Sequence, residues 1–249
     1  MPGAEPIRHD GGPVAVLLCH GFTGTPASLA EWAAHLAEAG HAVSVPRLPG
    51  HGTTWPEMNR TRWPDWYAAV ERELLALADT YEKVLVGGLS MGGGLALRLA
   101  AMHPDKVAGL MLVNPSVKLT DPRLLAVPIL RHLLPSLPGI ASDIKRAGVK
   151  ELAYDRVPLH ALHSSIRMNG LVLRALPQVS APLLVMRSTV DHVVPVSSGQ
   201  LVLDRVSSTD VTDIRLHDSF HVATQDDDAP LIFARSAEFV ARVTATVSR

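Results

Sequence analysis

Apolar and polar positions follow two alternating rhythms along most of the chain. Short, nearly continuous apolar runs predict buried strands, and they occupy 13–19, 41–46, 83–88, 107–113, 182–187 and 211–217. The segments between them carry apolar residues three or four positions apart, which predicts helices at 26–39, around 66–77, and at 91–103, 196–206 and 229–246. This alternation predicts an α/β fold with a mostly parallel central sheet and helices on both faces.

The rhythm breaks between residues 114 and 181. Prolines recur through this segment among many leucines, and the pattern predicts short helices that the prolines interrupt. We expect an inserted helical cap over the carboxyl edge of the sheet, where α/β proteins place their ligands. The predicted organisation is one domain, with an α/β core formed by 1–113 and 182–249 and a cap formed by 114–181.

Composition excludes several classes of function. The 249 residues are 47% hydrophobic, which is ample for one domain with a large core. Lys and Arg number 23 against 24 Asp and Glu, so no basic excess favours nucleic acid or stable membrane insertion as a partner. The apolar cap leaves transient membrane contact open, and composition does not predict the oligomeric state.

Targeting and redox signals are few. The start of the chain shows no secretory signal, and no apolar run approaches the ~20 residues that span a bilayer. We therefore expect a cytoplasmic protein. Cys19 is the single cysteine, so no disulfide can form within the chain, and its place in an apolar run predicts a core residue.

A glycine-rich stretch follows the strand predicted at 83–88. Its sequence Gly-Leu-Ser-Met-Gly, 88–92, fits the G-x-S-x-G turn that presents a serine nucleophile between a strand and a helix. Side chains in place of the glycines would collide with the neighbouring strand and helix, and the free N–H of Met91 at the helix start favours negative charge. The alternative is a glycine turn that only packs the helix on the sheet. Dinucleotide and phosphate-loop motifs do not fit.

A serine hydroxyl needs a base, and the base needs an orienting acid. The order typical of this turn is Ser, Asp or Glu, His, which favours Asp191 and then His217 or His221. We prefer His221, because His217 falls at the end of the predicted strand. Phe22 N–H, after the first long strand, and Met91 N–H would form the oxyanion hole. We expect no metal and no cofactor, since the sequence has no metalloprotease motif or cysteine cluster.

Six motifs along nearly the whole chain carry a resemblance to a known family. They are HGFTGTP, PRLPGHGT, GLSMGG, VKELAY, DHVVP and FHVAT, in this order. With them the chain resembles the α/β-hydrolase superfamily and, within it, the bacterial monoacylglycerol lipases and related carboxylesterases. The resemblance implies Ser90 as nucleophile, Asp191 as orienting acid and His221 as base, with an oxyanion hole from Phe22 and Met91.

The resemblance also implies the substrate, a small-molecule ester or lipid. The expected reaction is hydrolysis of a monoacylglycerol to fatty acid and glycerol through an acyl-enzyme. Glu151 matches the position that contacts the glycerol head group, and Ile140 matches one that lines the polar end of the pocket. Segment 115–138 matches the family pattern poorly, so the preferred acyl length is not predicted.

Three other functions stay open on the sequence. A short-chain carboxylesterase or thioesterase would use the same catalytic triad. A serine aminopeptidase would need acidic cap groups to hold the substrate amine, and the sequence offers Glu151 and Asp155. A non-catalytic small-molecule receptor would keep the fold and the pocket without turnover.

Overall fold

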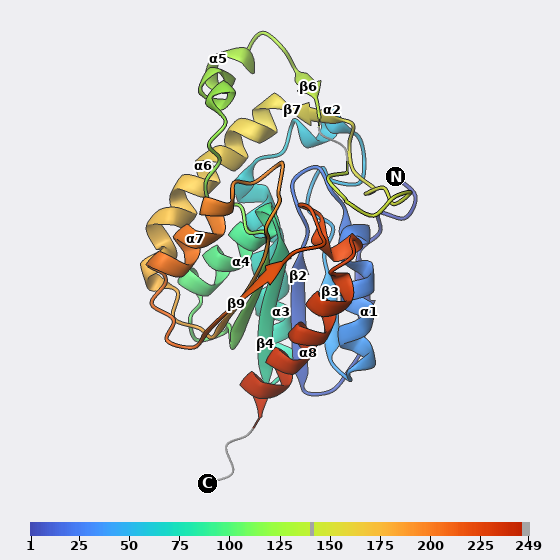
Figure 1. Cartoon of the computed structure of the whole chain (residues 1–249), viewed down its shortest axis with the longest axis vertical. Helices are drawn as coiled ribbons and strands as arrows, with labels where there is room; N and C mark the ends of the chain where they lie inside the picture. Colours follow the sequence, from blue (N-terminus) through green and yellow to red (C-terminus); the bar gives the residue numbers. More distant parts are fainter. Residues whose placement is uncertain (140–141, 246–249) are drawn as a thin grey trace.

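The central sheet has seven strands, and all but one run parallel. The computed structural model describes residues 1–139 and 142–245. Across the sheet the strands lie in the order β1 (Ile7–His9), β3 (Ala42–Val45), β2 (Val14–Cys19), β4 (Lys83–Leu89), β5 (Gly109–Val113), β8 (Leu183–Ser188) and β9 (Val211–Leu216). β1 alone pairs antiparallel, with β3. The predicted class is therefore confirmed (Figure 1).

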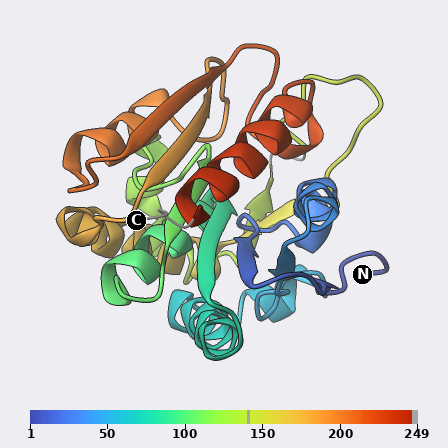
Figure 2. The ribbon, with the colours of Figure 1, turned by 90° about the horizontal axis from the view of Figure 1, so that it is seen from below.

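Helices cover both faces of this sheet. One face packs against α1 (Ala30–Glu38) and α8 (Ala229–Thr244). The other face packs against α3 (Trp63–Thr80), α4 (Met91–Met102) and α7 (Val196–Arg205), and α6 (Leu159–Ala175) lies beside α4 in the same core. Figure 2 shows the two layers from below, with α1 and α8 on one side of the strands and α3 on the other. This is the arrangement that a parallel sheet needs, because both of its faces are apolar.

Alternate residues of each central strand enter different cores. In β2, Leu17 and Cys19 pack on the side of α3 and α4, whereas Val16 and Leu18 pack on the side of α1 and α8. Trp66 is completely buried on the first side. The period of two between successive strand residues explains why the strands read as continuous apolar runs in the sequence.

Segment 114–181 adds no strand to the central sheet within its described residues. It holds a 3-10 turn (Pro122–Ala126), α5 (Val127–Leu130) and the hairpin of β6 (Ser136–Pro138) with β7 (Arg156–Pro158), followed by α6. In Figure 1, α5 and the hairpin lie at the end of the molecule opposite the C-terminus. The interrupted helices expected here occur only in the first half, because Pro158 and Pro177 flank the uninterrupted 17-residue helix α6. Since α6 packs beside α4, the boundaries of the cap stay a prediction.

Short elements account for the remaining differences from the expected pattern. β1 and the one-turn helix α2 (Trp55–Met58) are too short to show a periodicity in the sequence. The helix predicted to begin at Pro26 starts as a 3-10 turn (Pro26–Leu29) before α1. Two further 3-10 turns lie at Leu176–Gln178 and Ala223–Gln225.

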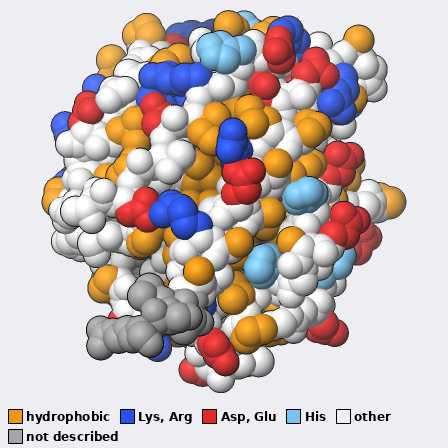
Figure 3. All heavy atoms as spheres, turned by 60° about the horizontal axis from the view of Figure 1, so that its bottom comes forward, with side chains coloured by type: hydrophobic (Ala, Val, Ile, Leu, Met, Phe, Trp, Pro, Cys, Tyr) orange, Lys and Arg blue, Asp and Glu red, His pale blue; other side chains and the backbone are white. Residues whose placement is uncertain are grey.

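The surface agrees with the balanced composition. On the end of the molecule away from α5, acidic and basic side chains are interspersed with apolar ones (Figure 3). Pairs such as Arg242 with Asp210, 2.6 Å apart, bring the two signs together. In the described part of the chain, no helix combines the length and the apolar character that a membrane span needs.

The approach of α4 to β2 is close enough to require glycine. A Cβ atom at Gly92 would lie 1.9 Å from the carbonyl oxygen of Cys19 in β2. A Cβ atom at Gly88 would lie 2.4 Å from the main chain of Gly92. The end of β4 and the start of α4 therefore pack backbone to backbone, with Ser90 between them.

This contact predicts a stability difference between two glycine substitutions. Gly92→Ala should lower the free energy of unfolding by about 3 kcal/mol, because the backbone of β2 leaves no room for the methyl group. Gly170→Ala, inside α6 with nothing within 4 Å of its Cβ position, should raise it by about 0.5–1 kcal/mol. Urea unfolding measures both values, and equal effects of the two substitutions would contradict the close approach.

Candidate active site

Ser90 occupies a strained backbone conformation between β4 and α4. Its φ of 56° and ψ of −119° lie outside the regions that non-glycine residues prefer, which costs about 1–3 kcal/mol. Hydrogen bonds hold this conformation: Ser90 N–H donates to Val113 O at 3.0 Å, and Ser90 O accepts from the N–H groups of Gly93, Gly94 and Ser116. The side chain is thereby fixed at the carboxyl end of β4.

The start of α4 and the loop after β2 both lie beside this serine. Met91 is the first residue of α4, so its N–H has no acceptor within the helix, and the helix start favours negative charge. The loop after β2 passes beside Ser90, because a Cβ atom at Gly21 would lie 4.0 Å from the Ser90 hydroxyl oxygen. Phe22 follows in this loop. Met91 therefore directly follows Ser90, and Phe22 follows Gly21 in the neighbouring loop, while their role as an oxyanion hole stays a prediction.

A buried histidine braces the loop after β2. His20 Nε2 accepts the N–H of Leu48 at 3.2 Å, so the ring proton lies on Nδ1 and is donated to Gly21 O at 3.0 Å. Burial lowers the pKa of His20 to about 4, although the hydrogen bond to Gly21 acts in the opposite direction. The ring therefore stays neutral at ordinary pH and keeps both contacts.

His221 and Asp191 come together at the same edge of the sheet. His221 Nδ1 lies 2.7 Å from Asp191 Oδ2, and their side chains are 8% and 4% exposed. The other carboxylate oxygen, Oδ1, accepts the N–H groups of Val193 and Val194 at 2.8 and 2.7 Å. Since a carboxylate only accepts, the imidazole proton lies on Nδ1, and Nε2 is left to take a proton. His217, the alternative histidine, is exposed at the end of β9.

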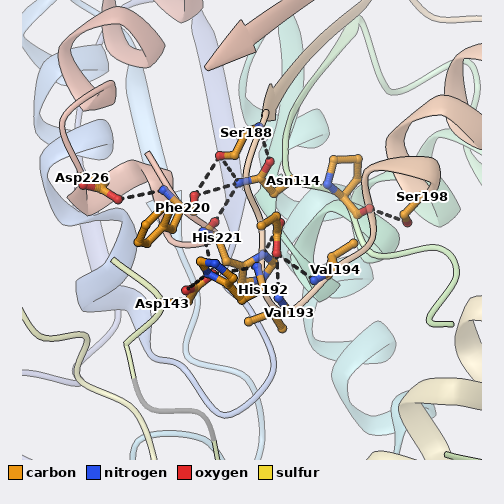
Figure 4. A network of polar contacts seen from close by, with 12 residues as sticks. Asn114, Asp143, Ser188, His192, Val193, Val194, Ser198, Phe220, His221 and Asp226 are labelled. Atoms are coloured by element: carbon orange, nitrogen blue, oxygen red, sulfur yellow. Dashed lines mark hydrogen bonds and ion pairs between the residues drawn. The ribbon is translucent and has the colours of Figure 1, made fainter. Parts of the chain in front are cut away.

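Asn114 joins the loop of His221 to the strand beside Ser90. Its amide group donates to His221 O at 2.8 Å, and its Oδ1 accepts the N–H of Ser188 at 2.8 Å (Figure 4). The preceding residue, Val113, accepts the N–H of Ser90. Asn114 could not be recognised from the sequence beyond its position after a strand, because its partners lie 74 and 107 residues away.

The charges around His221 decide its protonation. Burial alone would lower the pKa of the imidazole, but the hydrogen bond and negative charge of Asp191 outweigh it, helped by the charges of Glu151 and Asp143. The pKa of His221 is therefore raised above its ordinary value of 6.5. Three carboxylates facing one imidazole favour the imidazolium that proton transfer from a serine would create.

Of the two residues expected at the polar end of the pocket, the structure describes one. A Cβ atom at Gly24 would lie 2.7 Å from Glu151 Oε1, so the carboxylate lies against the loop after β2. Burial raises the pKa of Glu151 to about 7, and the charge of His221 acts to lower it. Ile140 lies outside the described residues. The described residues include no group of three or more His, Cys, Asp or Glu that could hold a metal ion.

A parallel sheet with helices on both faces and a strained serine at a strand-to-helix turn defines an α/β-hydrolase. The family model described as "Serine aminopeptidase, S33" matches residues 13–228. A thermostable monoacylglycerol lipase of Bacillus sp. (strain H-257) is 42% identical over 97% of this chain and 96% of its own. A carboxylesterase of Bacillus subtilis (strain 168) is 25% identical over 96% and 97%.

Solved structures show the same relationship. A structure from a study of LipS and LipT, two metagenome-derived lipolytic enzymes, has a TM-score of 0.95 and 40% identity, and covers 97% of this chain and 99% of its own. A monoacylglycerol lipase of Paleococcus ferrophilus, 17% identical, shares the fold with a TM-score of 0.79 over 96% of this chain and 98% of its own. The chain therefore belongs to the monoacylglycerol lipase family of α/β-hydrolases and is a serine hydrolase, as its motifs predicted.

The environment of His221 predicts a particular pH dependence. Turnover should need the neutral imidazole, so kcat/KM on a soluble ester should rise with pH about a midpoint above 6.5. In Asp191→Asn, the amide oxygen of the new side chain must take the place of Oδ1, because it accepts the N–H groups of Val193 and Val194. The amide NH₂ group then faces His221 Nδ1 and selects the wrong tautomer of the imidazole. We expect kcat to fall about 10³–10⁴-fold and the midpoint to move lower. A wild-type midpoint below 6.5, or an unchanged profile in the variant, would contradict this assignment.

Proposed function

We propose that the chain hydrolyses monoacylglycerols to fatty acid and glycerol with Ser90, His221 and Asp191 as its catalytic triad. His221 Nε2 takes the proton of the Ser90 hydroxyl while the oxygen attacks the ester carbonyl. Asp191 keeps the imidazole in the required tautomer and stabilises its positive charge. The observation that carries the proposal is the buried 2.7 Å pair of His221 with Asp191, on the loops beside the strained turn of Ser90.

The reaction proceeds in two halves. In the first, negative charge on the carbonyl oxygen is stabilised by the N–H groups of Phe22 and Met91, and glycerol leaves with the proton of His221. In the second, His221 activates a water that attacks the acyl-enzyme, and the fatty acid is released. Losing one oxyanion donor typically costs about 2.7–4 kcal/mol of transition-state stabilisation, so the close fit of both loops matters for rate.

A largely apolar cavity supports an acyl substrate. Its volume is about 420 Å³, and it lies between segment 117–125 and α6. The lining includes Val117, Leu119, Leu124, Ile166 and Leu173. The segment begins beside the nucleophile, because Ser116 N–H donates to Ser90 O. Each methylene buried there would contribute about 0.8 kcal/mol, which favours a fatty acyl chain over an acetyl group.

Exposed apolar side chains on the cap support a transient contact with lipid. Leu125, Ile129 and Leu133 are 84%, 70% and 72% exposed. They lie in and around α5, at the end of the molecule that Figure 1 shows opposite the C-terminus. A cap with these residues in contact with a lipid aggregate would place the cavity close to its substrate.

Peptidase activity has less support than ester hydrolysis. The matching family model carries the name of an aminopeptidase, and a substrate amine would need buried acidic partners. Asp155 is exposed. Burial raises the pKa of Glu151 to about 7, so near neutral pH its carboxyl group carries only part of a negative charge. The two relatives named above that match nearly the whole chain are a monoacylglycerol lipase and a carboxylesterase.

The contact of Glu151 with the head group predicts a substrate-dependent effect. Wild type should hydrolyse monoacylglycerols of medium or long chain faster than acetyl or butyryl esters. In Glu151→Gln, KM for a monoacylglycerol should rise about tenfold, since a hydrogen bond to a charged group contributes about 1.5–3 kcal/mol. The methyl ester of the same fatty acid has no glycerol, so its kcat/KM should fall only through the lost charge near His221 and therefore by less than that of the monoacylglycerol. Initial rates are measured on the high-pH plateau of the wild-type profile, where His221 is neutral.

The controls separate the alternatives. Ser90→Ala should show no turnover of any ester, because the attacking oxygen is gone. Equal losses on both substrates in Glu151→Gln would contradict the head-group contact. Turnover of acetyl and butyryl esters alone would favour a short-chain esterase, and no turnover by wild type would favour a receptor.

A further inference from the structure

A third carboxylate, that of Asp143, contacts the main chain of His221 and acts through its charge to raise the pKa of the imidazole. Asp143 comes from the segment between the two strands of the cap hairpin, and its side chain is 9% exposed. Its Oδ2 accepts the main-chain N–H of His221 and that of His192, both at 3.1 Å. Its Oδ1 lies 2.7 Å from His192 Nδ1 (Figure 4). The carboxylate thus contacts two loops at once.

These two loops are the ones that carry the proposed base and acid. His221 is the base, and His192 directly follows Asp191, the orienting acid. Main-chain groups hydrogen-bonded to a carboxylate are held by charge-assisted bonds, which are about twice as strong as neutral ones. The distance between the two loops, and with it the 2.7 Å contact of His221 with Asp191, therefore depends on a residue of the cap segment.

Reciprocal hydrogen bonds fix Asp143 itself. Asp143 O accepts the N–H of Val222 at 3.1 Å, so the segment holds two consecutive residues of the base loop. Asp226, fully buried on the core side, binds the cap segment in return. Its carboxylate accepts the main-chain N–H groups of Lys145, Arg146 and Phe220, at 2.7, 2.9 and 2.9 Å.

We propose that Asp143 is a positioning residue for catalysis, which holds the base and acid loops together and stabilises the imidazolium of His221. This inference rests on the proposed triad. The groups that face the imidazole are Asp191, Glu151 and Asp143, and each favours its charged form. Asp143 acts through the main chain of His221 and through its charge, without touching the substrate. Hydrogen bonds thereby join the cap segment directly to the loop that carries the proposed base.

Two exposed ion pairs join the same segments and supply a matched control. Lys145 lies 2.9 Å from Asp218, and Arg146 lies 2.9 Å from Asp227. These pairs also connect the cap segment with the loop around His221, but they do not contact His221 or Asp191. Exposed pairs typically contribute about 0–1 kcal/mol to stability. Asp218→Asn therefore removes a connection between the same segments and leaves the charge of Asp143 in place.

The test compares Asp143→Asn with Asp218→Asn on a soluble ester across pH. Asp143→Asn should lower kcat about 10–100-fold with KM within about twofold, and the midpoint of the pH profile should move lower, because one negative charge facing His221 is gone. Asp218→Asn should keep the wild-type kcat and midpoint. Asp143→Glu, which keeps the charge but not the geometry, should keep the midpoint while kcat falls, and it serves the comparison should Asp143→Asn not fold.

The outcomes separate this inference from the proposed function. A wild-type kcat and midpoint in Asp143→Asn, or equal losses in Asp143→Asn and Asp218→Asn, would overturn the positioning role while leaving the triad intact. A midpoint in Asp143→Glu that moves as far as in Asp143→Asn would overturn the role of the charge. Absence of ester turnover in wild type would instead overturn the proposed function.

Discussion

The strained turn at Ser90 is the constraint on which the site depends. A side chain can project from the end of β4 only because the backbone turns sharply at φ 56°, and that turn fits only because Gly88 and Gly92 let β4, α4 and β2 meet backbone to backbone. The strain of about 1–3 kcal/mol is offset by hydrogen bonds to both main-chain groups of Ser90. The same turn leaves the N–H of Met91 beside the hydroxyl. The position of the proposed nucleophile and the N–H group beside it thus follow from the same local backbone geometry.

Around this turn, parallel topology brings distant loops to one edge. The loops after β2, β4, β8 and β9 all leave the sheet at the carboxyl ends of their strands, which is where α/β proteins bind ligands. Loop backbone cannot bond to a neighbouring strand, so buried side chains supply its partners: Asn114 and Asp226 from the core, and Asp143 from the cap segment. The position of His221 therefore depends on several side chains along this edge of the sheet. The segment that contributes Asp143 is therefore tied to the loop of the proposed base.

Much of this architecture could be predicted from the sequence, and the exceptions have physical causes. The central strands were visible because both of their faces are buried, and Ser90 stood out because glycines surround it at a strand-to-helix junction. His221 was preferred over His217 as the base because His217 falls at the end of the predicted strand, and of the two the structure brings His221 to Asp191. Asp143 and Asn114 gave no local signal, because their roles consist of contacts with residues far along the chain. α6 was obscured by the prolines at its ends, and β1 by its length of three residues.

The central claim is that His221 makes the hydroxyl of Ser90 nucleophilic. Reaction with a serine-directed phosphonate, followed by mass mapping of the modified peptide, measures this reactivity without any assumption about the substrate. The account predicts a single adduct on Ser90 in wild type and in His217→Ala, and a loss of labelling rate of about 10³-fold or more in His221→Ala. An adduct on another residue, or rapid labelling of Ser90 in His221→Ala, would contradict it.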